Sequence, residues 1–483
     1  MKRFFYITTT LPYVNDKPHI GHALEFVQAD ALARSRRLRG DDVFFNTGTD
    51  EHGQKIFDKA VKEGRDVKEY VDFYAERFIA LKDKLDLSYD AFIRTTDEKH
   101  IEAAQEIWRR CEAAGDIYKK NYKTKYCVGC ELEKTDSELV EGKCSIHPHL
   151  ELQIVDEENY FFRLSKYKDA LLAYLAGDVI TPESRKNDAI NFVRSEGFQD
   201  FSISRLKEKM SWGIPVPGDD TQVMYVWFDA LTNYISTLDW PSSAEASDGK
   251  PGLFQKFWVD GQTLQVAGKD QVRMQSIMWQ AMLMSAKLPP TQHVFYHGFV
   301  TSGGQKMSKS LGNVLDPFEY AEEFGIDVVR YFFLRHMHPF EDSDFTRERF
   351  IESYNAGLAN GLGNLVSRVM KMAEEHLEGP VTVPEWEDFT DYFALLDAFK
   401  FNEACDLIWQ KIAECDALIQ ETQPFRVIKD DVEKGRVLIA DLAVRLYTIG
   451  RMLNPIMPTT SKLIKDAVKA NKKPENMFAR REV

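Results

Sequence analysis

Phe4-Phe-Tyr-Ile-Thr-Thr-Thr10, a short loop and then His19-Ile-Gly-His22 give the strongest indication of the fold. The first run is aromatic and β-branched, which predicts a buried strand. Residues 19–39 predict a helix that ends near Gly40, and Val43–Asn46 predicts a second short strand. A strand–helix–strand crossover of this length indicates a parallel, doubly wound sheet.

A second pattern of the same kind lies far along the chain. Leu264–Ala267 predicts a strand, Gln271–Lys287 a helix and His293–Tyr296 another strand. Between the two patterns lies an insertion of different character, roughly 116–222, with short strand-like runs. Ser242–Gly252 is rich in Ser, Gly, Pro and charge and predicts an exposed loop. The sheet is therefore expected to be a split Rossmann-type sheet, assembled from two separate halves.

From about residue 350 the sequence changes to helical periodicity. Apolar residues recur there every three or four positions, at Leu358, Leu362, Leu365 and Val369. A proline-containing loop, Gly379–Trp386, interrupts the pattern. This part of the chain predicts an α-helical bundle domain.

Composition limits the class of protein. The chain has 483 residues, of which 44% are hydrophobic and 29% charged, so global disorder is excluded. Charges break every long apolar run, and the N-terminus lacks a long apolar region. Neither a membrane span nor secretion is therefore expected. The net charge of −14 argues against nucleic-acid binding by bulk charge and favours a cytoplasmic enzyme.

Three of the six cysteines cluster in the insertion. They lie in Cys127-Val-Gly-Cys130 and Cys144-Ser-Ile-His147, two pairs with the spacing of a structural Cys₃His zinc site. His149 is a competing ligand, and reduced thiols without metal are the alternative. Four protein ligands would leave no open position, so such a zinc knuckle would hold the insertion together and perform no chemistry.

His19 and His22 lie one helical turn apart and share a face in the first turn of their helix. Helix N-termini offer free N–H groups and a positive dipole, which suit a phosphate. Gly21 lets a nucleotide approach the backbone. Taken alone, such a pair of histidines favours a structural role.

Gly303-Gly-Gln-Lys306-Met-Ser-Lys309-Ser-Leu-Gly312 is a glycine-flanked segment with two lysines. Lys306 and Lys309 are placed to close onto a polyphosphate. Taken alone, the segment favours a solvated basic loop.

Together, His-Ile-Gly-His and Lys-Met-Ser-Lys-Ser resemble the paired signatures of the class I aminoacyl-tRNA synthetases. The resemblance covers essentially the whole chain. Further blocks are similar to the methionyl-tRNA synthetase family: Leu11-Pro-Tyr13, Thr47-Gly-Thr-Asp50-Glu-His-Gly53, Trp212-Gly-Ile-Pro-Val-Pro217, Tyr225-Val-Trp227-Phe-Asp229-Ala230 and Gly268-Lys-Asp270.

The resemblance implies a role for each matching residue. The catalytic residues would be His19, His22, Lys306 and Lys309. The ATP site would contain Tyr13, Gly21, Glu25, Gly268, Lys269, Asp270 and Val300. The amino-acid pocket would contain Leu11, Tyr13, Asp50, Trp227, Ala230, Tyr234, Gln275 and Trp279. Asp50 would receive the substrate ammonium, and the aromatic rings suit a polarisable thioether.

The pocket departs from the family pattern at one helix. Family members usually carry a histidine four residues before the pocket tryptophan, where this chain has Gln275 before Trp279. Gln271 likewise occupies a position that is commonly aliphatic. Glutamine can donate and accept hydrogen bonds as a neutral histidine can, so methionine remains the expected substrate.

In the helical part, Asn364-Leu-Val-Ser-Arg368 resembles the family's anticodon-reading helix. Asn364 and Arg368 lie four residues apart on one face, where an amide and a guanidinium can read or stack on bases. Phe425 follows Pro424 where the family often has a tryptophan as its stacking platform. A phenylalanine ring still offers a face for stacking.

The expected activity is the ATP-dependent ligation of methionine to tRNA through methionyl-adenylate, with Mg²⁺ on the phosphates and structural Zn²⁺. The expected partners are methionine and the initiator and elongator methionine tRNAs, with no membrane, and the chain is expected to be a monomer. The predicted domains are 1–115 and 223–300 (catalytic halves), 116–222 (connective insertion), 301–350 (Lys-Met-Ser-Lys-Ser loop and stem contact) and 351–483 (anticodon-binding).

Four alternatives compete with this expectation, and a feature of the sequence argues against each. A valine, isoleucine or leucine enzyme would need an editing domain that does not fit between the signatures, and a cysteinyl enzyme would place its zinc in the active site. A non-catalytic tRNA-binding relative is expected to have lost some signature residues. A nucleotidyltransferase for a small molecule would have no use for a helical anticodon domain.

Overall fold

The computed structural model describes residues 3–130, 132–134, 139–242, 251–306, 316–385 and 388–482. Most of the predicted loop Ser242–Gly252 lies outside them. The chain divides into two compact units. The first contains Met1–Pro18, Asp41–Ala80 and Tyr89–His297, and the second contains His19–Gly40, Leu81–Ser88 and Gly298–Val483.

A parallel sheet forms the centre of the first unit. Its strand order is β3-β2-β1-β14-β15-β9, and every neighbouring pair is parallel. β1 and β14 are buried along almost their whole length, as expected when both faces of a sheet are covered. Their bounds are β1 (Phe4–Thr9), β2 (Asp42–Thr49), β3 (Ala91–Arg94), β9 (Ile180–Thr181), β14 (Gln262–Gly268) and β15 (His293–His297).

β1 and β14 lie side by side although some 250 residues separate them, and the Thr10 backbone N–H donates to the Val266 carbonyl at 3.1 Å. This pairing joins the two predicted halves, so the prediction of a split parallel sheet is confirmed. Ligands of such sheets bind beyond the carboxyl ends of the strands, where the strand order reverses. The segments that follow β1, β2 and β14 meet at that edge.

Helices of the first unit build its core around fully buried Trp108, Trp258 and Trp279. The predicted helix Gln271–Lys287 is made of a 3₁₀ turn (η5), a π-helical turn (η6) and an α-helix (α10). The helices are α2 (Gln54–Lys62), α3 (Val67–Ile79), α5 (Glu98–Ala113), η2 (Leu164–Tyr167), α6 (Lys168–Leu175), α7 (Glu183–Arg194), α8 (Val226–Ala230), α9 (Asn233–Ser236), η4 (Phe254–Val259), η5 (Lys269–Gln271), η6 (Met274–Met278) and α10 (Trp279–Ser285).

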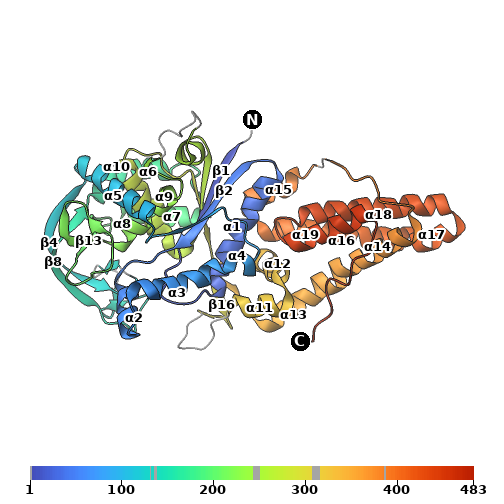
Figure 1. Cartoon of the computed structure of the whole chain (residues 1–483), viewed down its shortest axis with the longest axis horizontal. Coiled ribbons are helices and arrows are strands. Elements are labelled where there is room, and N and C mark those ends of the chain that lie inside the picture. Colours follow the sequence, from blue (N-terminus) through green and yellow to red (C-terminus); the bar gives the residue numbers. More distant parts are fainter. Residues whose placement is uncertain are drawn as a thin grey trace. The chain divides into compact units, whose positions relative to one another are not determined.

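The insertion is built on a long antiparallel pair, β4 and β8, visible in Figure 1. These strands belong to a sheet of order β10-β8-β4-β5, beside the sheets β11-β13-β12 and β6-β7. The bounds are β4 (Ile117–Cys127), β5 (Leu132–Lys134), β6 (Leu139–Val140), β7 (Lys143–Cys144), β8 (Gln153–Phe162), β10 (Phe201–Ser202), β11 (Ser204–Leu206), β12 (Pro215–Val216) and β13 (Asp219–Met224).

The second unit is mainly helical, and α14, α16 and α18 pack side by side (Figure 1). Leu358, Leu362, Leu365 and Val369 are fully buried there, which confirms the predicted apolar stripe. Among the described residues no helix is long and apolar enough to cross a membrane. The elements are α1 (Ile20–Leu38), α4 (Leu81–Lys84), β16 (Val300–Ser302), β17 (Gln305–Lys306), α11 (Pro317–Phe324), α12 (Ile326–His336), β18 (Ser343–Asp344), α13 (Arg347–Ser353), η8 (Tyr354–Gly363), α14 (Asn364–His376), α15 (Thr390–Asp397), α16 (Phe401–Thr422), α17 (Pro424–Asp430), α18 (Val432–Met452) and α19 (Pro458–Ala470).

A buried ion pair fixes α1 within the second unit. Asp30 on α1 and Arg330 on α12 are both fully buried, 2.7 Å apart. Arg330 also donates to the carbonyls of Ile456 (3.0 Å) and Pro455 (2.9 Å). Burial raises the pKa of Asp30, but Arg330 and Arg34 outweigh it and lower this pKa below its ordinary value. The helix that begins with the signature histidines is thus joined to the turn before α19.

Candidate active site

His19 and His22 cap the first turn of α1. The Nδ1 atom of His19 accepts the Gly21 backbone N–H at 3.1 Å, and Nδ1 of His22 accepts the His19 backbone N–H at 3.2 Å. The rings stack with centroids 3.7 Å apart. Because each Nδ1 atom is an acceptor, the proton of each neutral ring is on Nε2.

Burial keeps both imidazoles neutral. It lowers the pKa of His19 to about 4, and together with His19 it lowers the pKa of His22 well below its ordinary value. The pair therefore supplies N–H donors at neutral pH and no full positive charge. Donors of this kind, beside the dipole of α1, suit phosphate oxygens.

Gly21 leaves room for the ring of His19 in the histidine cap. A Cβ atom at this position would lie 3.0 Å from Cε1 of the His19 ring. The predicted approach of a nucleotide is thus a second reason for glycine. Glu25 lies one turn further along α1 and is buried.

The second signature follows β16 and lies only partly within the described residues. Val300 on β16 is buried, and Lys306 pairs with Thr301 through the backbone of β17. Lys309 lies outside the described residues. The described residues therefore give no position for either lysine side chain.

The loops after β1 and β2 meet in the first unit. The Asp50 backbone N–H donates to the Pro12 carbonyl at 2.9 Å, and the Val14 N–H donates to the Asp50 carbonyl at 3.1 Å. Tyr13 and Asp50 form an isolated parallel bridge. Asp50 is 3% exposed, and Leu11 is half-buried. The structure therefore brings three predicted amino-acid-binding residues to the carboxyl edge of the sheet.

Gly268, Lys269 and Asp270 follow β14 at the same edge. A Cβ atom at Gly268 would lie 2.8 Å from Oδ1 of Asp270, so glycine allows this carboxylate to fold back over the backbone. Asp270 is exposed and Lys269 half-buried. Gln271 donates to Asp270 at 3.4 Å. This arrangement leaves charged groups accessible at the end of the strand.

An aromatic wall carries the remaining pocket residues. The rings of Tyr234 and Trp279 lie 5.7 Å apart, and Nε2 of Gln275 donates to the Tyr234 hydroxyl. α8 carries buried Ala230 and half-buried Trp227. Gln275, which stands where family members usually have a histidine, thus contacts the Tyr234 hydroxyl through an amide in place of an imidazole.

Three polar atoms of this wall are buried without a hydrogen-bond partner among the described residues: Gln275 Oε1, Trp279 Nε1 and Trp227 Nε1. Buried polar atoms are nearly always paired in proteins. Unpaired ones at a predicted pocket are typical of groups that meet a ligand or an ordered water.

Sequence reasoning missed a polar network behind Asp50. Asp229 is fully buried and contacts His52 Nδ1 at 2.7 Å and His100 Nε2 at 2.8 Å. One signal was available, because Asp229 interrupts the apolar run Tyr225–Ala230 and a buried carboxylate requires partners. Its partners come from distant parts of the chain and could not be identified from spacing.

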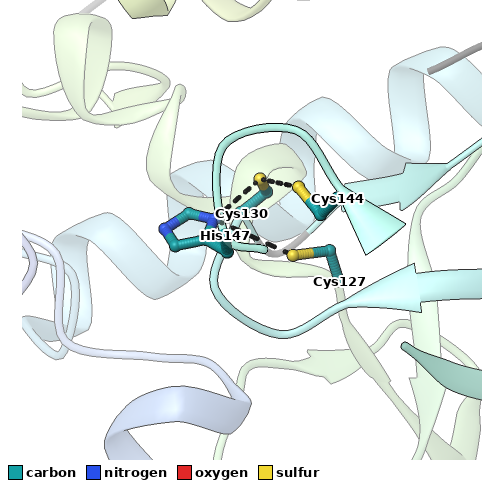
Figure 2. Close-up of side chains that lie close together, drawn as sticks. All are labelled: Cys127, Cys130, Cys144 and His147. Carbon is teal, nitrogen blue, oxygen red and sulfur yellow. Dashed lines mark hydrogen bonds between the residues drawn. The ribbon is translucent and has the colours of Figure 1, made fainter. Parts of the chain in front are cut away.

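The four predicted zinc ligands converge, as Figure 2 shows. Cys127, Cys130, Cys144 and His147 offer ligand atoms that all lie within 4.8 Å of one another. Cys130 Sγ lies 3.5 Å from Cys144 Sγ and 3.2 Å from His147 Nδ1. Tetrahedral zinc with bonds of about 2.3 Å places sulfur atoms roughly 3.8 Å apart, so the donor set fits this metal.

Gly129 and the local backbone explain the shape of the cluster. A Cβ atom at Gly129 would lie 2.6 Å from the His147 ring, so only glycine allows the ring to approach. Burial raises the pKa of Cys144, but the backbone N–H groups of His147 and Ile146 outweigh it and lower this pKa. His149 lies beside His147 with ring centroids 6.1 Å apart, and the cluster contains His147.

The predicted anticodon residues lie on α14 and α17. Asn364 is exposed, and Arg368 donates to Asp416 on α16 at 2.8 Å. Phe425 is 43% exposed, while the preceding Pro424 is buried at the first position of α17. The proline fixes the start of the helix, so the phenylalanine ring projects into solvent.

Comparison with known proteins places these features in one family. The family described as tRNA synthetases class I (M) matches residues 5–153 and 134–370. The methionine–tRNA ligase of Caldanaerobacter subterraneus subsp. tengcongensis is 42% identical over 96% of this chain and 73% of its own length. That of Rhizobium meliloti is 40% identical over 96% and 91%.

A solved structure is similar along its whole length. Mycobacterium tuberculosis methionyl-tRNA synthetase in complex with methionyl-adenylate has a TM-score of 0.90 and 35% identity, and the match covers 99% of this chain and 100% of that one. The split sheet, the cysteine insertion and the helical region therefore have one common explanation. The chain belongs to the methionine-specific family of class I tRNA synthetases.

Proposed function

We infer that the chain is a methionine–tRNA ligase, which activates methionine with ATP and transfers it to tRNA. The observation that carries this inference is the match over 99% of the chain to a synthetase that holds methionyl-adenylate, at a TM-score of 0.90. The intact His19–His22 cap and the aromatic wall support it, since a non-catalytic relative would have no need of either.

In the first step the methionine carboxylate attacks the α-phosphorus of ATP in line and pyrophosphate leaves. Asp50 binds the substrate ammonium, and the wall of Trp227, Tyr234 and Trp279 contacts the thioether, which is polarisable and packs well on rings. Gln275 orients the Tyr234 hydroxyl. The reaction needs no enzyme nucleophile, so catalysis consists of positioning and charge stabilisation.

The proposed active site must also bind the phosphates of ATP. His19 and His22 donate to them through Nε2–H, while Lys306 and Lys309 balance the charge that develops as pyrophosphate leaves. Tyr13, Gly21, Glu25, Val300 and the segment 268–270 border the rest of the nucleotide. Mg²⁺ neutralises the phosphates when bound.

In the second step the terminal ribose hydroxyl of tRNA attacks the adenylate carbonyl, and AMP leaves. Asn364, Arg368 and Phe425 contact the anticodon of the initiator and elongator methionine tRNAs. Exposed side chains of these types read single-stranded bases through their edges and faces. The proposed enzyme acts as a cytoplasmic monomer.

Zn²⁺ on Cys127, Cys130, Cys144 and His147 is structural in this proposal. These four residues would hold the ion with no open coordination position, and it would join the end of β4 to the β6–β7 hairpin. We expect Cys144→Ser to abolish bound zinc and to expose residues 127–147 to proteases. Cys111→Ala is the matched control, because Cys111 is buried outside the cluster and should leave the zinc content unchanged.

Pyrophosphate exchange into ATP against all amino acids tests the activity. Methionine should support exchange, and failure with methionine while another amino acid succeeds would overturn the assignment. A variant with Asn364, Arg368 and Phe425 all changed to alanine tests the proposed anticodon role and leaves the second unit uncut. It should keep adenylate formation and lose tRNA charging, whereas a small-molecule enzyme would show no such difference.

A further inference from the structure

The two residues that follow Asp50 contact different elements of the first unit through their side chains. We propose that Glu51 and His52 are positioning residues, which hold Asp50 in place through two separate buried networks. The Asp50 carboxylate is then already oriented when the methionine ammonium binds. The proposal rests on the role of Asp50 in the proposed function. Its evidence is independent of that role and lies entirely in the first unit.

Glu51 forms the first network, towards β3. Its side chain is fully buried, and Arg94 donates to Oε1 from Nε at 2.6 Å and to Oε2 from Nη2 at 2.8 Å. The Thr96 hydroxyl donates to Oε2 at 2.6 Å. The Glu51 backbone is held as well, because its N–H donates to the Thr95 hydroxyl at 2.9 Å and its carbonyl accepts the Trp212 indole N–H at 2.6 Å. A bidentate arginine fork resists rotation better than a single contact does.

His52 forms the second network, towards α8 and α5. Its Nδ1 contacts one oxygen of Asp229, and His100 Nε2 contacts the other. The second ring nitrogen of His100 pairs with the Ser236 hydroxyl at 3.0 Å. Asp229 and His100 are fully buried. Burial raises the pKa of Asp229, but the two histidines outweigh it and lower this pKa, so the carboxylate stays ionised.

The two networks act on one short segment. The Asp50 backbone is bound to Pro12 and Val14, and the next two side chains are bound to β3 and to α8. Rotation of the segment would break a buried bond in at least one of these directions. The loss of conformational freedom has thus occurred on folding and need not accompany substrate binding.

The second network also connects the residues that are proposed to contact the two ends of methionine. Asp229 lies on α8 between Trp227 and Ala230, which belong to the proposed pocket. The contact of His52 with Asp229 therefore fixes the ammonium acceptor relative to a wall of the thioether pocket. A loss of this contact should weaken recognition of the ammonium more than recognition of the thioether.

Asp229→Asn tests the proposal with three ligands. An asparagine cannot accept from both histidines without a change of tautomer, so the His52 contact is weakened while the volume is kept. We expect the KM for methionine in pyrophosphate exchange to rise about tenfold. The Ki of methioninol, which keeps the ammonium, should rise equally, and the Ki of deaminated methionine should stay within twofold.

A purely structural role predicts a different pattern. General loosening of the pocket would weaken all three ligands alike, and that result, or no change for any of them, would overturn the proposal. Arg94→Lys tests the Glu51 network, because lysine keeps the positive charge but cannot form the two parallel hydrogen bonds that Arg94 makes to Glu51. His52→Gln replaces Asp229→Asn if the latter variant does not fold.

Two further variants make the outcome specific. Asp116→Asn is a matched control, because Asp116 is a buried carboxylate of the same unit that binds Lys166, Tyr167 and Ser285. It should leave all three ligands unaffected. Asp50→Asn separates the proposals. If it does not weaken methionine, the ammonium role of Asp50 is wrong. If it does while Asp229→Asn and Arg94→Lys do not, only the positioning role is wrong.

Discussion

The residues of the proposed methionine pocket and those of the proposed anticodon site differ sharply in burial. Asp50, Gln275 and Trp279 are almost fully buried, and Gln275 is hydrogen-bonded to Tyr234. Asn364 and Phe425 are exposed, and Arg368 is held by one ion pair with Asp416. One surface is completed before its ligand arrives, whereas the other presents single side chains to solvent.

The difference follows from the size of the ligands. A free amino acid offers few atoms, so selectivity requires enclosure and prearranged polar groups. An anticodon offers several bases with faces and edges, and each can be met by a separate side chain. Changes in the enclosed pocket should therefore have large effects on both stability and activation. Changes at the anticodon end should affect only the tRNA step.

The largest effect is expected for Trp279→Ala, which removes a fully buried ring that contacts Tyr234 and Trp258. A change of this kind costs about 3–5 kcal/mol of folding stability. The KM for methionine should rise at least about tenfold, with the KM for ATP unchanged. Denaturant unfolding and pyrophosphate exchange measure the two effects. Unchanged stability would mean that the Trp279 ring contributes little to the packing of the proposed pocket.

The buried imidazole of His19 should make the stability of the folded chain depend on pH. Its pKa is about 4 in the folded chain and 6.5 in an exposed histidine, so the unfolded chain binds more protons between these values. Stability should be intact above pH 6.5 and fall as the pH drops towards 4, by up to about 3 kcal/mol. His19→Asn keeps a capping acceptor and should remove this part of the pH dependence of unfolding.

Phe425→Ala should give an intermediate effect, confined to tRNA. Loss of one base-stacking ring costs about 1–3 kcal/mol, which corresponds to roughly a 5- to 140-fold loss in kcat/KM for aminoacylation. Pyrophosphate exchange and the melting temperature should not change, because the ring is exposed. Val437→Ala is the control, since Val437 is also an exposed apolar residue. An equal loss in that variant would rule out a specific role for Phe425.

The smallest effect is expected for Asp416→Asn. Its ion pair with Arg368 is partly exposed at both ends, and such pairs contribute about 0–1 kcal/mol. Stability should change by less than about 1 kcal/mol and the KM for tRNA by less than about fivefold. A larger rise in that KM would mean that Asp416 orients Arg368 towards the base, which would make the anticodon end more prearranged than its exposure indicates.

Local patterns were sufficient for much of the fold. β1, α1 and β2 follow from the residues between Phe4 and Asn46, because side-chain periodicity reflects burial directly. The cysteine spacing likewise predicted four side chains that meet, since a tight turn brings each pair together. The resemblance to a known family supplied the substrate, which no periodicity contains.

The network behind Asp50 was beyond such patterns. His52, His100 and Asp229 lie on three elements that are distant in the sequence, and a lone histidine or aspartate is equally consistent with many partners. The same holds for Asp30 and Arg330, which join α1 to α12 within the second unit.

The strands and helices next to the two signatures, the zinc spacing and the resemblance to the family could be recognised from the amino-acid sequence alone. These features are carried by neighbours in the chain, where backbone geometry relates spacing to position. The tertiary structure determined which charges are buried together and therefore which side chains are held rigid. Pairing of that kind depends on long-range contacts, whose partners chain packing selects and local propensity does not encode.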